Sequence, residues 1–277
     1  MIWVLDNSGK NAARIKPLLN ALAASARRHN QKFKILAEYP YKKETVRQAA
    51  EAGLFISIGG DGTVLSAVPL ITAAGAPLLP VNFGKLGFIS SVSESSAVQI
   101  LEAFLSGRTA DYKTENRRLL EAGFCGKRFL ALNDAVLSRG SCPRLLRFTV
   151  SISGISITEV RADGVIISTA TGSTAYNLAA SGPILHPQVP ALILNLISPH
   201  SLTFKPIIFP ENETIQIKVS DLPEKHRAII DIDGHLESAL KNNGDMRVRL
   251  TDQKISVLKP SEENYYLVLK EKLKWGV

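Results

Sequence analysis

The first hundred residues alternate short apolar runs with stretches whose apolar residues recur at helical spacing. Apolar runs of strand length occupy residues 3–5, 33–37, 54–58 and 76–81. Helical spacing is found at residues 15–22, 46–51, 63–74 and 97–105. We expect Pro69 to kink or interrupt the third helix, and Gly107 to follow the end of the fourth. Strands that alternate with helices predict an open, mostly parallel α/β sheet covered on both faces.

From about residue 112 the pattern changes to the two-residue period of half-buried strands. Phe148, Val150 and Ile152 alternate with polar residues, which illustrates this period. Runs of strand length follow one another at residues 118–124, 128–137, 146–153, 155–160, 165–168, 192–197, 214–219, 228–232, 247–250 and 255–258. One short helix is expected at 174–180 and a last one at 265–275. We therefore predict an α/β domain at residues 1–111, joined by the segment 260–277, and an all-β, sandwich-like domain at 112–259.

Composition excludes several classes of protein. The chain has 277 residues, 45% of them hydrophobic, which is enough for substantial cores. Its apolar runs are far shorter than the roughly 18 residues that cross a bilayer, and Asp6 interrupts the first one, so we expect a cytoplasmic protein without a membrane partner. Cys125 and Cys142 are the two cysteines, and neither a Cys-x-x-Cys nor a His-Glu-x-x-His pattern occurs. We therefore predict neither a disulfide framework nor a protein-held metal.

The formal net charge of +8 fits a polyanionic partner, but it does not identify one. The basic residues are scattered in pairs and form no long block with interleaved aromatic residues. A nucleic acid is therefore a poor candidate, and a phosphate-rich small molecule remains open.

The segment Gly59-Gly60-Asp61-Gly62-Thr63 lies between a predicted buried strand and a predicted helix. Glycines in such a turn let backbone N–H groups approach a phosphate, and the helix N-terminus adds positive potential. The segment is not a Walker A loop, because the pattern Gly-x-x-x-x-Gly-Lys-Ser/Thr does not occur in the chain. It is not a Rossmann fingerprint either, because Leu65 stands where the third glycine belongs. A plain structural turn would also explain the glycines. It would not explain Asp61, whose carboxylate repels phosphate unless it holds a metal or receives a proton.

Asn133-Asp134 is a polar pair inside an apolar, strand-like stretch. Both residue types are poor strand formers, so a bulge or turn is one explanation. The functional alternative is that the Asn amide meets a base while the Asp carboxylate accepts hydrogen bonds from ribose hydroxyls.

Residues 161–183 bring together a charged pair, many hydroxyl groups and one aromatic ring. Loops rich in Ser and Thr are common, so this composition by itself is weak support for a site. His200 and His235 follow later in the chain, and a single histidine is more often a packing residue than a ligand contact.

In their order along the chain, these segments resemble the NAD kinase family. The resemblance rests on 59–63, on Asn82-Phe83-Gly84-Lys85-Leu86-Gly87-Phe88, on Asn133-Asp134, on Thr171-Gly172-Ser173-Thr174-Ala175-Tyr176, on Pro199-His200-Ser201-Leu202 and on the segment from Leu269 to Trp275. It covers most of the chain from about residue 54 onward. A Gly-Gly-Asp-Gly segment alone would be weak, since lipid kinases and phosphofructokinases are similar there.

The resemblance implies an α/β domain, a β-sandwich domain and a final helix that returns to the first domain, with NAD bound between the domains. It implies that Asp61 is the general base acting on the 2′-hydroxyl of the adenosine ribose, and that Gly59, Gly60, Gly62 and Thr63 form the phosphate loop. Further substrate contacts are implied for Gly62, Asn133, Asp134, Arg144, Arg161, Asp163, Thr171, Thr174, Ala175, Tyr176, Asn177, Leu178, Ala179 and His235. At position 134 the family more often has Glu, and the shorter Asp leaves open how directly the carboxylate reaches the ribose.

The resemblance implies ATP with a divalent metal such as Mg²⁺, or polyphosphate, as the phosphoryl donor, and a homodimer or homotetramer as the assembly. Lys85 is a candidate for neutralising donor charge. Two alternatives remain at this point: a lipid kinase of the diacylglycerol type, and a catalytically silent NAD-binding sensor.

Overall fold

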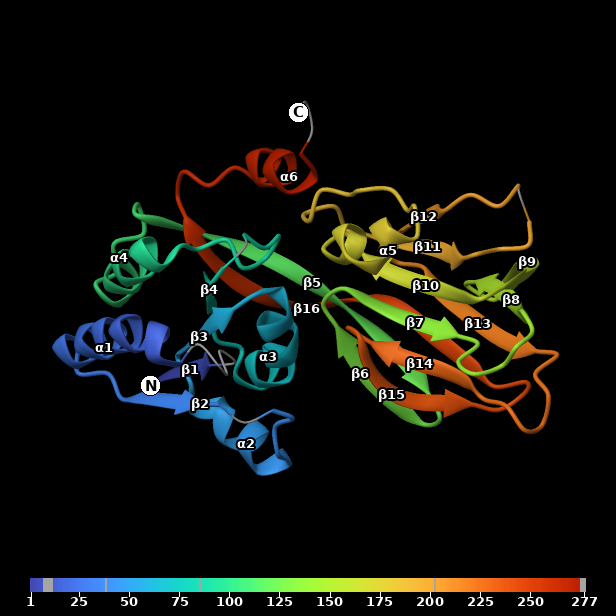
Figure 1. Ribbon diagram of the computed structural model, residues 1–277, viewed down its shortest axis with the longest axis horizontal. Coiled ribbons are helices and arrows are strands. Elements are labelled where there is room, and N and C mark those ends of the chain that lie inside the picture. Colours follow the sequence, from blue (N-terminus) through green and yellow to red (C-terminus); the bar gives the residue numbers. More distant parts are fainter. Residues whose placement is uncertain (7–11, 38, 85, 202, 275–277) are drawn as a thin grey trace. The chain divides into compact units, whose positions relative to one another are not determined.

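The computed structural model describes residues 1–6, 12–37, 39–84, 86–201 and 203–274 (Figure 1). The chain divides into two compact units, Met1–Asn116 with Ile255–Val277, and Arg117–Lys254. Both boundaries fall inside long strands, β5 (Tyr112–Phe124) and β16 (Asp245–Pro260). The change of period near residue 112 marks the beginning of β5.

Unit 1 is an α/β unit built on four parallel strands. These are β1 (Ile2–Asp6), β2 (Phe33–Leu36), β3 (Leu54–Gly59) and β4 (Leu78–Asn82). Their order in the sheet is β2-β1-β3-β4, and the end of β16 pairs with β4 in parallel through Val257 and Leu78. The helical elements are α1 (Ala12–Arg28), α2 (Lys43–Gln48), η2 (Ala49–Glu51), α3 (Asp61–Ala74), α4 (Glu94–Leu105) and α6 (Tyr265–Leu273).

The strand order decides which helix covers which face of this sheet. The chain moves one way from β1 through α1 to β2, and the opposite way from β3 through α3 to β4. Because such crossovers are right-handed, α1 and α3 lie on opposite faces. The reversal also makes the carboxyl ends of β1 and β3 a topological switch point, where ligands bind in open α/β sheets. Asp61 directly follows β3 at this edge.

Apolar side chains pack the helices against the sheet. Ile15, Leu18 and Leu22 of α1 and Ile100 of α4 share one buried cluster with alternate residues of β1, β3 and β4. On β1 and β3, Trp3 and Phe55 point away from this cluster and pack edge to face, with ring centroids 6.1 Å apart. Side chains alternate across a strand, so the two sets occupy the two faces of the sheet.

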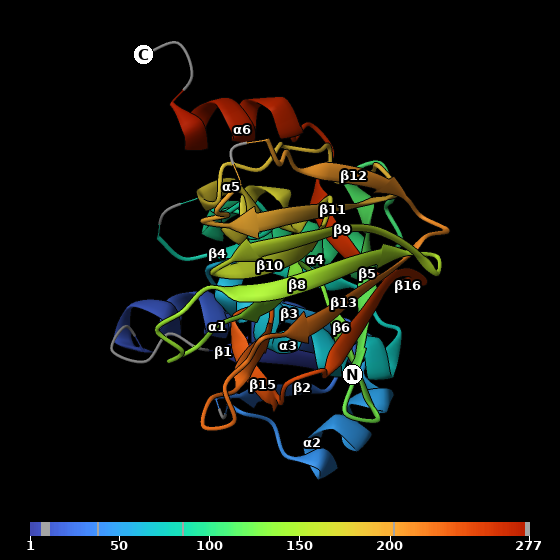
Figure 2. The ribbon, with the colours of Figure 1, turned by 90° about the vertical axis from the view of Figure 1, so that its right-hand side faces the viewer.

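Unit 2 is an antiparallel β sandwich. One sheet has the order β12-β11-β10-β7-β14-β15. Its strands are β7 (Asp134–Ser138), β10 (Gly164–Thr169), β11 (Ala191–Ile197), β12 (Ile207–Pro210), β14 (Ala228–Ile232) and β15 (His235–Leu240). The facing layer contains the unit 2 parts of β5 and β16 with β6 (Lys127–Ala131), β8 (Leu146–Ile152), β9 (Ile155–Ala162) and β13 (Thr214–Ser220). The strands of this unit are seen from another side in Figure 2.

One apolar core fills the space between the two sheets of unit 2. Phe148, Val150 and Ile152 of β8 enter it, in agreement with the alternation read from the sequence. Leu192, Leu194 and Leu196 of β11 enter it from the other sheet. The predicted fold class, a mostly parallel α/β unit plus an antiparallel sandwich, is confirmed.

Several predicted elements are wrong in detail. The single strand expected at 128–137 is two strands, β6 and β7, because the backbone N–H groups of Leu132 and Asn133 bond to a side chain instead of a neighbouring strand. The strands expected at 247–250 and 255–258 are one long strand, β16. Strands β12 and β15 were not predicted. Helix α3 begins at Asp61, two residues before the predicted start at residue 63. It continues through Pro69 without the expected interruption.

In the described part of the chain, no helix is both long enough and apolar enough to cross a bilayer.

Candidate functional site

The glycine-rich turn of unit 1 sits at the switch point, between the end of β3 and the first turn of α3. Gly59 has φ of 153°, and a Cβ there would lie 2.3 Å from the Thr63 hydroxyl oxygen, so both backbone and space require glycine. At Gly60 and Gly62 a Cβ would meet no described atom within 4 Å. The packing of the described residues therefore does not require these two glycines, and none of those residues fills the space above them.

Asp61 is the first residue of α3, and its carboxylate is held by the turn that follows β4. Oδ2 accepts a hydrogen bond from the Phe88 N–H at 2.9 Å. Oδ1 accepts from the Ile89 N–H at 3.1 Å, and from the N–H and hydroxyl of Ser90 at 2.8 and 2.7 Å. One side chain thus fixes two segments to each other that lie almost thirty residues apart along the chain. Lys85, the candidate for charge neutralisation, lies outside the described residues.

In unit 2, the predicted pair Asn133-Asp134 is held by Asp233, a residue that the sequence pattern did not mark as part of the site. The Asp233 carboxylate accepts hydrogen bonds from the backbone N–H groups of Leu132, Asn133 and Asp134 at 2.8, 2.7 and 3.1 Å. Asp233 has φ of 50° and forms, with Gly234, the tight turn between β14 and β15. The Asp-Gly dipeptide was the available signal, but it indicated only a turn.

Asp134 is a buried carboxyl group among other acids. Burial, together with the nearby charges of Asp233 and Asp231, raises its pKa to about 7. Burial also raises the pKa of Asp233. The three backbone hydrogen bonds to Asp233 and the nearby His235 lower this pKa and so offset part of the increase. Within the described residues, no donor reaches the Asp134 carboxylate. A buried acid with no protein donor is a group that a ligand can satisfy.

The last residue of β10 and the chain that follows it pack directly on the Asn133 backbone. Thr169 donates its hydroxyl to the Leu132 carbonyl at 2.6 Å, and its N–H bonds to the Asn133 carbonyl at 2.8 Å. At Gly172 a Cβ would lie 2.2 Å from the Asn133 carbonyl oxygen, so only glycine fits. The structure therefore brings Asn133, Asp134 and the start of the 171–179 segment together, and His235 lies near the same cluster.

Residues 170–185 form an ordered cover over the outer face of β10 and β11. Asn177 is fully buried, and its amide donates to the carbonyls of Ser173 and Pro183 and accepts from Asn195. These bonds use the side chain inside the protein, so we expect Asn177 to shape the cover and not to donate to a ligand. Of the other predicted contacts here, Thr171 is buried, Thr174, Ala175 and Leu178 are half-buried, and Tyr176 and Ala179 are exposed.

Arg161 and Asp163 lie near the start of β10, whereas Asp134 pairs with Ser168 near its end. Four residues of extended strand separate the two places by about 13 Å. Asp163 accepts from Arg139 Nε at 2.6 Å, and Arg161 is an exposed residue 3.7 Å from Asp221. Arg144 is exposed in the turn before β8. The structure thus does not bring these three predicted residues to Asn133-Asp134 within the chain.

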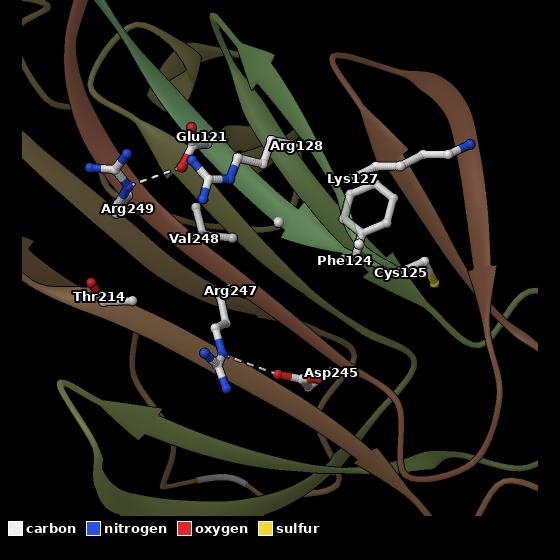
Figure 3. Close-up of a pocket in the computed structure, with 12 residues that line it drawn as sticks. Glu121, Phe124, Cys125, Lys127, Arg128, Thr214, Asp245, Arg247, Val248 and Arg249 are labelled. Carbon is white, nitrogen blue, oxygen red and sulfur yellow. Dashed lines mark hydrogen bonds and ion pairs between the residues drawn. The ribbon is translucent and has the colours of Figure 1, made fainter.

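A hollow of about 570 Å³ opens on the facing layer of unit 2 (Figure 3). It is lined by residues of β5, β6, β13 and β16, including four cationic ones: Lys127, Arg128, Arg247 and Arg249. Arg249 is paired with Glu121 at 3.0 Å and Arg247 with Asp245 at 3.3 Å (Figure 3). None of the predicted site residues lines it, and half of its positive charge is already compensated.

Comparisons with known proteins agree on one family. The model of the ATP-NAD kinase N-terminal domain matches residues 11–109, and that of the ATP-NAD kinase C-terminal domain matches residues 132–259. The NAD kinase of Azoarcus sp. (strain BH72) is 41% identical over 232 residues, which cover 82% of this chain and 77% of the relative. The NAD kinase of Koribacter versatilis is 38% identical over 226 residues, or 80% and 77% of the two chains.

Solved structures show the same fold. A yeast NADH kinase complexed with NADH aligns with a TM-score of 0.83 at 22% identity, over 99% of this chain and 87% of the other. An NAD kinase from Archaeoglobus fulgidus in complex with ATP aligns with a TM-score of 0.76 at 19% identity, over 99% and 98%. Both halves of the chain match one family in sequence and in fold, and the chain belongs to the NAD kinase family.

Proposed function

We propose that this protein is a phosphotransferase that moves the γ-phosphoryl group of ATP to the 2′-hydroxyl of the adenosine ribose of NAD, giving NADP. The observation that carries the proposal is the Asp61 carboxylate, fixed beside an open glycine turn at the switch point of the unit 1 sheet. The names of the relatives support the activity, and the neighbours solved with NADH and with ATP support the two substrates.

Asp61 acts as the general base in this proposal. It accepts the hydroxyl proton while the ribose oxygen attacks the γ-phosphorus. Phosphoryl transfer goes through a loose transition state, so alignment and charge neutralisation matter more than a strong base. A carboxylate held in one orientation by four hydrogen bonds meets the first requirement.

The phosphate loop consists of Gly59, Gly60, Gly62 and Thr63. The space above Gly60 and Gly62, which no described residue fills, lets phosphate oxygens approach the backbone, and the N-terminus of the 14-residue α3 supplies positive potential. In this proposal, the loop compensates the repulsion between Asp61 and the donor phosphates.

Unit 2 supplies the contacts to the adenosine ribose and base. The Asp134 carboxylate accepts hydrogen bonds from ribose hydroxyls, in place of donors that none of the described residues provides, and the Asn133 amide meets the base edge. Thr171, Thr174, Ala175, Tyr176, Leu178, Ala179 and His235 remain candidates for the surrounding contacts. Asn177 supports them from the interior through its bonds to Ser173 and Pro183.

ATP brings magnesium with it as part of the donor substrate, and polyphosphate is the alternative donor. Incubation with NAD and each donor separates these cases by the rate of NADP formation. We also propose a cytoplasmic location, where NAD and ATP are both available.

We further propose that the protein is a homodimer or homotetramer. Strand β9 ends the sheet path of its layer, and Ile155 and Ile157 on it are 70% and 42% exposed. An unprotected edge strand with apolar side chains favours pairing with a second copy. Light scattering coupled to gel filtration measures the assembly directly, and a monomer at micromolar concentration would refute it.

The activity is tested with purified protein, ATP with magnesium, and NAD, with NADP followed by an NADP-specific dehydrogenase. We expect NADP from NAD, and no phosphorylation of diacylglycerol, which would indicate the lipid kinase alternative. A protein that binds NAD but forms no NADP would be the silent sensor.

The Asp61→Asn variant tests the role of the base. The variant retains the side-chain shape but places an amide NH₂ opposite the Phe88 N–H, so thermal unfolding must confirm that it folds. We expect turnover to fall by about 100-fold or more, with an NAD dissociation constant within about threefold of wild type. Single-turnover phosphorylation as fast as in wild type would exclude Asp61 as the base.

A further inference from the structure

The hydrogen-bond donors to the Asp61 carboxylate are divided unevenly between its two oxygens. A carboxylate offers about four acceptor positions, two on each oxygen. Oδ1 receives three donors, from Ile89 and twice from Ser90, and Oδ2 receives one, from Phe88. Oδ1 therefore has no remaining position for a substrate hydroxyl, whereas Oδ2 has one.

The Ser90 hydroxyl is itself held in a donating orientation. It is fully buried, and it lies 3.4 Å from the side-chain amide nitrogen of Asn82, which donates to it. Since the hydroxyl has only one hydrogen, this arrangement directs that hydrogen to Asp61 Oδ1 at 2.7 Å. Asn82 ends β4, so the rigid sheet determines the direction of the bond.

Gly87 allows the turn to come this close. A Cβ at Gly87 would lie 2.1 Å from Asp61 Oδ1 and 2.3 Å from the Ser90 hydroxyl oxygen. Any side chain at position 87 would have to displace the carboxylate or the hydroxyl. The contact between the turn and Asp61 thus depends on glycine at this position.

From these contacts we infer that Ser90 is a positioning residue for phosphoryl transfer. Its hydroxyl adds the shortest of the three hydrogen bonds to Oδ1, at 2.7 Å, and holds the carboxyl group against rotation, so that Oδ2 is the oxygen presented to the substrate. The proton of the ribose hydroxyl moves to Oδ2 as its O–H bond breaks. The ribose oxygen forms the new O–P bond, and the bond from the γ-phosphorus to ADP breaks. This inference rests on the proposed function and adds to it the atom that takes the proton.

The test compares Ser90→Ala, Ser90→Cys and Ser90→Thr with wild type. Alanine removes the donor, cysteine keeps the volume with a weak donor, and threonine keeps the hydroxyl. We expect kcat to fall about 10-fold to 100-fold in the alanine variant and less in the cysteine variant. Threonine should restore kcat to within about threefold, with KM for NAD within about twofold throughout.

Ser91→Ala is the matched control. The Ser91 hydroxyl is buried in the same turn and has no hydrogen-bond partner among the described residues. Its removal should leave kcat unchanged. If Ser90 acts through Asp61, Ser90→Ala in an Asp61→Asn background should alter the residual single-turnover rate less than about twofold.

The results separate this inference from the proposed function. Wild-type protein that makes no NADP contradicts the function itself. Active wild type with unchanged kcat in both Ser90→Ala and Ser90→Cys overturns the positioning role. A rise in KM for NAD without a fall in kcat would show that the turn binds substrate instead, and would also overturn it.

Discussion

The Asp134 carboxyl group, which we propose binds the ribose, should lower the stability of the folded protein because it is buried. An increase of its pKa from the ordinary 3.8 to about 7 corresponds to about 4 kcal/mol of cost for the charged form, at about 1.36 kcal/mol per pH unit. Between these two pH values the folded protein binds more protons than the unfolded chain does. The contribution of Asp134 therefore reduces the free energy of unfolding as pH rises from about 4 to about 7, and stays unfavourable above it.

Asp134→Asn should remove most of this cost. The amide must still be buried, which costs about 1–2 kcal/mol if it finds no partner. We thus expect the variant to be about 2 kcal/mol more stable than wild type at pH 8, and about equal to it or less stable at pH 4. Urea unfolding followed by circular dichroism at the two pH values measures the difference. Glu237→Gln, an exposed acid on β15, is the control and should show no such pH dependence.

The same variant should bind NAD more weakly, because a carboxylate that accepts ribose hydroxyls is lost. A gain in stability together with a loss of affinity is the expected sign of a site that is strained in the absence of its ligand. An Asp134→Asn protein that is less stable than wild type at pH 8 would refute the reasoning. It would mean that the folded protein compensates the Asp134 charge.

Two further substitutions test the phosphate loop and the buried ion pairs of unit 1. Gly62→Ala places a methyl group in the first turn of α3, where no described residue would contact it, so the free energy of unfolding should rise by up to about 1 kcal/mol. Turnover should fall at least about 10-fold because the methyl group obstructs the phosphate. Unchanged turnover would show that Gly62 does not contribute to phosphate binding. Lys259 is 1% exposed and lies 3.3 Å from Glu115 and 2.5 Å from Glu263. Lys259→Met leaves two buried carboxylates and should cost about 3–5 kcal/mol in urea unfolding, whereas the exposed Lys254→Met should cost little; equal costs would contradict the prediction.

The fold class was predictable because it follows from the periods of apolar residues. A run such as Leu54 to Ile58 is too short and too apolar to be anything but a buried strand beside the helices that flank it. The alternation of Phe148, Val150 and Ile152 likewise determines which face of β8 is buried. Strand ends were less predictable. Whether 128–137 is one strand or two depends on where the Asp233 carboxylate lies, a hundred residues further along the chain.

The candidate site was partly predictable for a chemical reason. An acid between phosphate-binding glycines, and an Asn-Asp pair in an apolar strand, conflict with local preference, and such conflicts mark functional residues. Asp61 and Asp134 could therefore be named from the chain alone. Asp233, Ser90 and Gly87 could not, since they act by bonding to or leaving space for residues distant in sequence. Asn177 shows the opposite case, a residue in a promising segment whose amide is used inside the protein.

The sequence by itself determined the plan of an α/β unit followed by a β sandwich, the glycine turn after β3 and the identity of the acids, because these depend on local period and residue chemistry. Tertiary structure alone decided the orientation of the Asp61 carboxylate, the raised pKa of Asp134, and the separation of Arg161 and Asp163 from Asn133. Each of these depends on which backbone N–H groups, charges or strand ends come together when distant segments pack, and no local pattern records that.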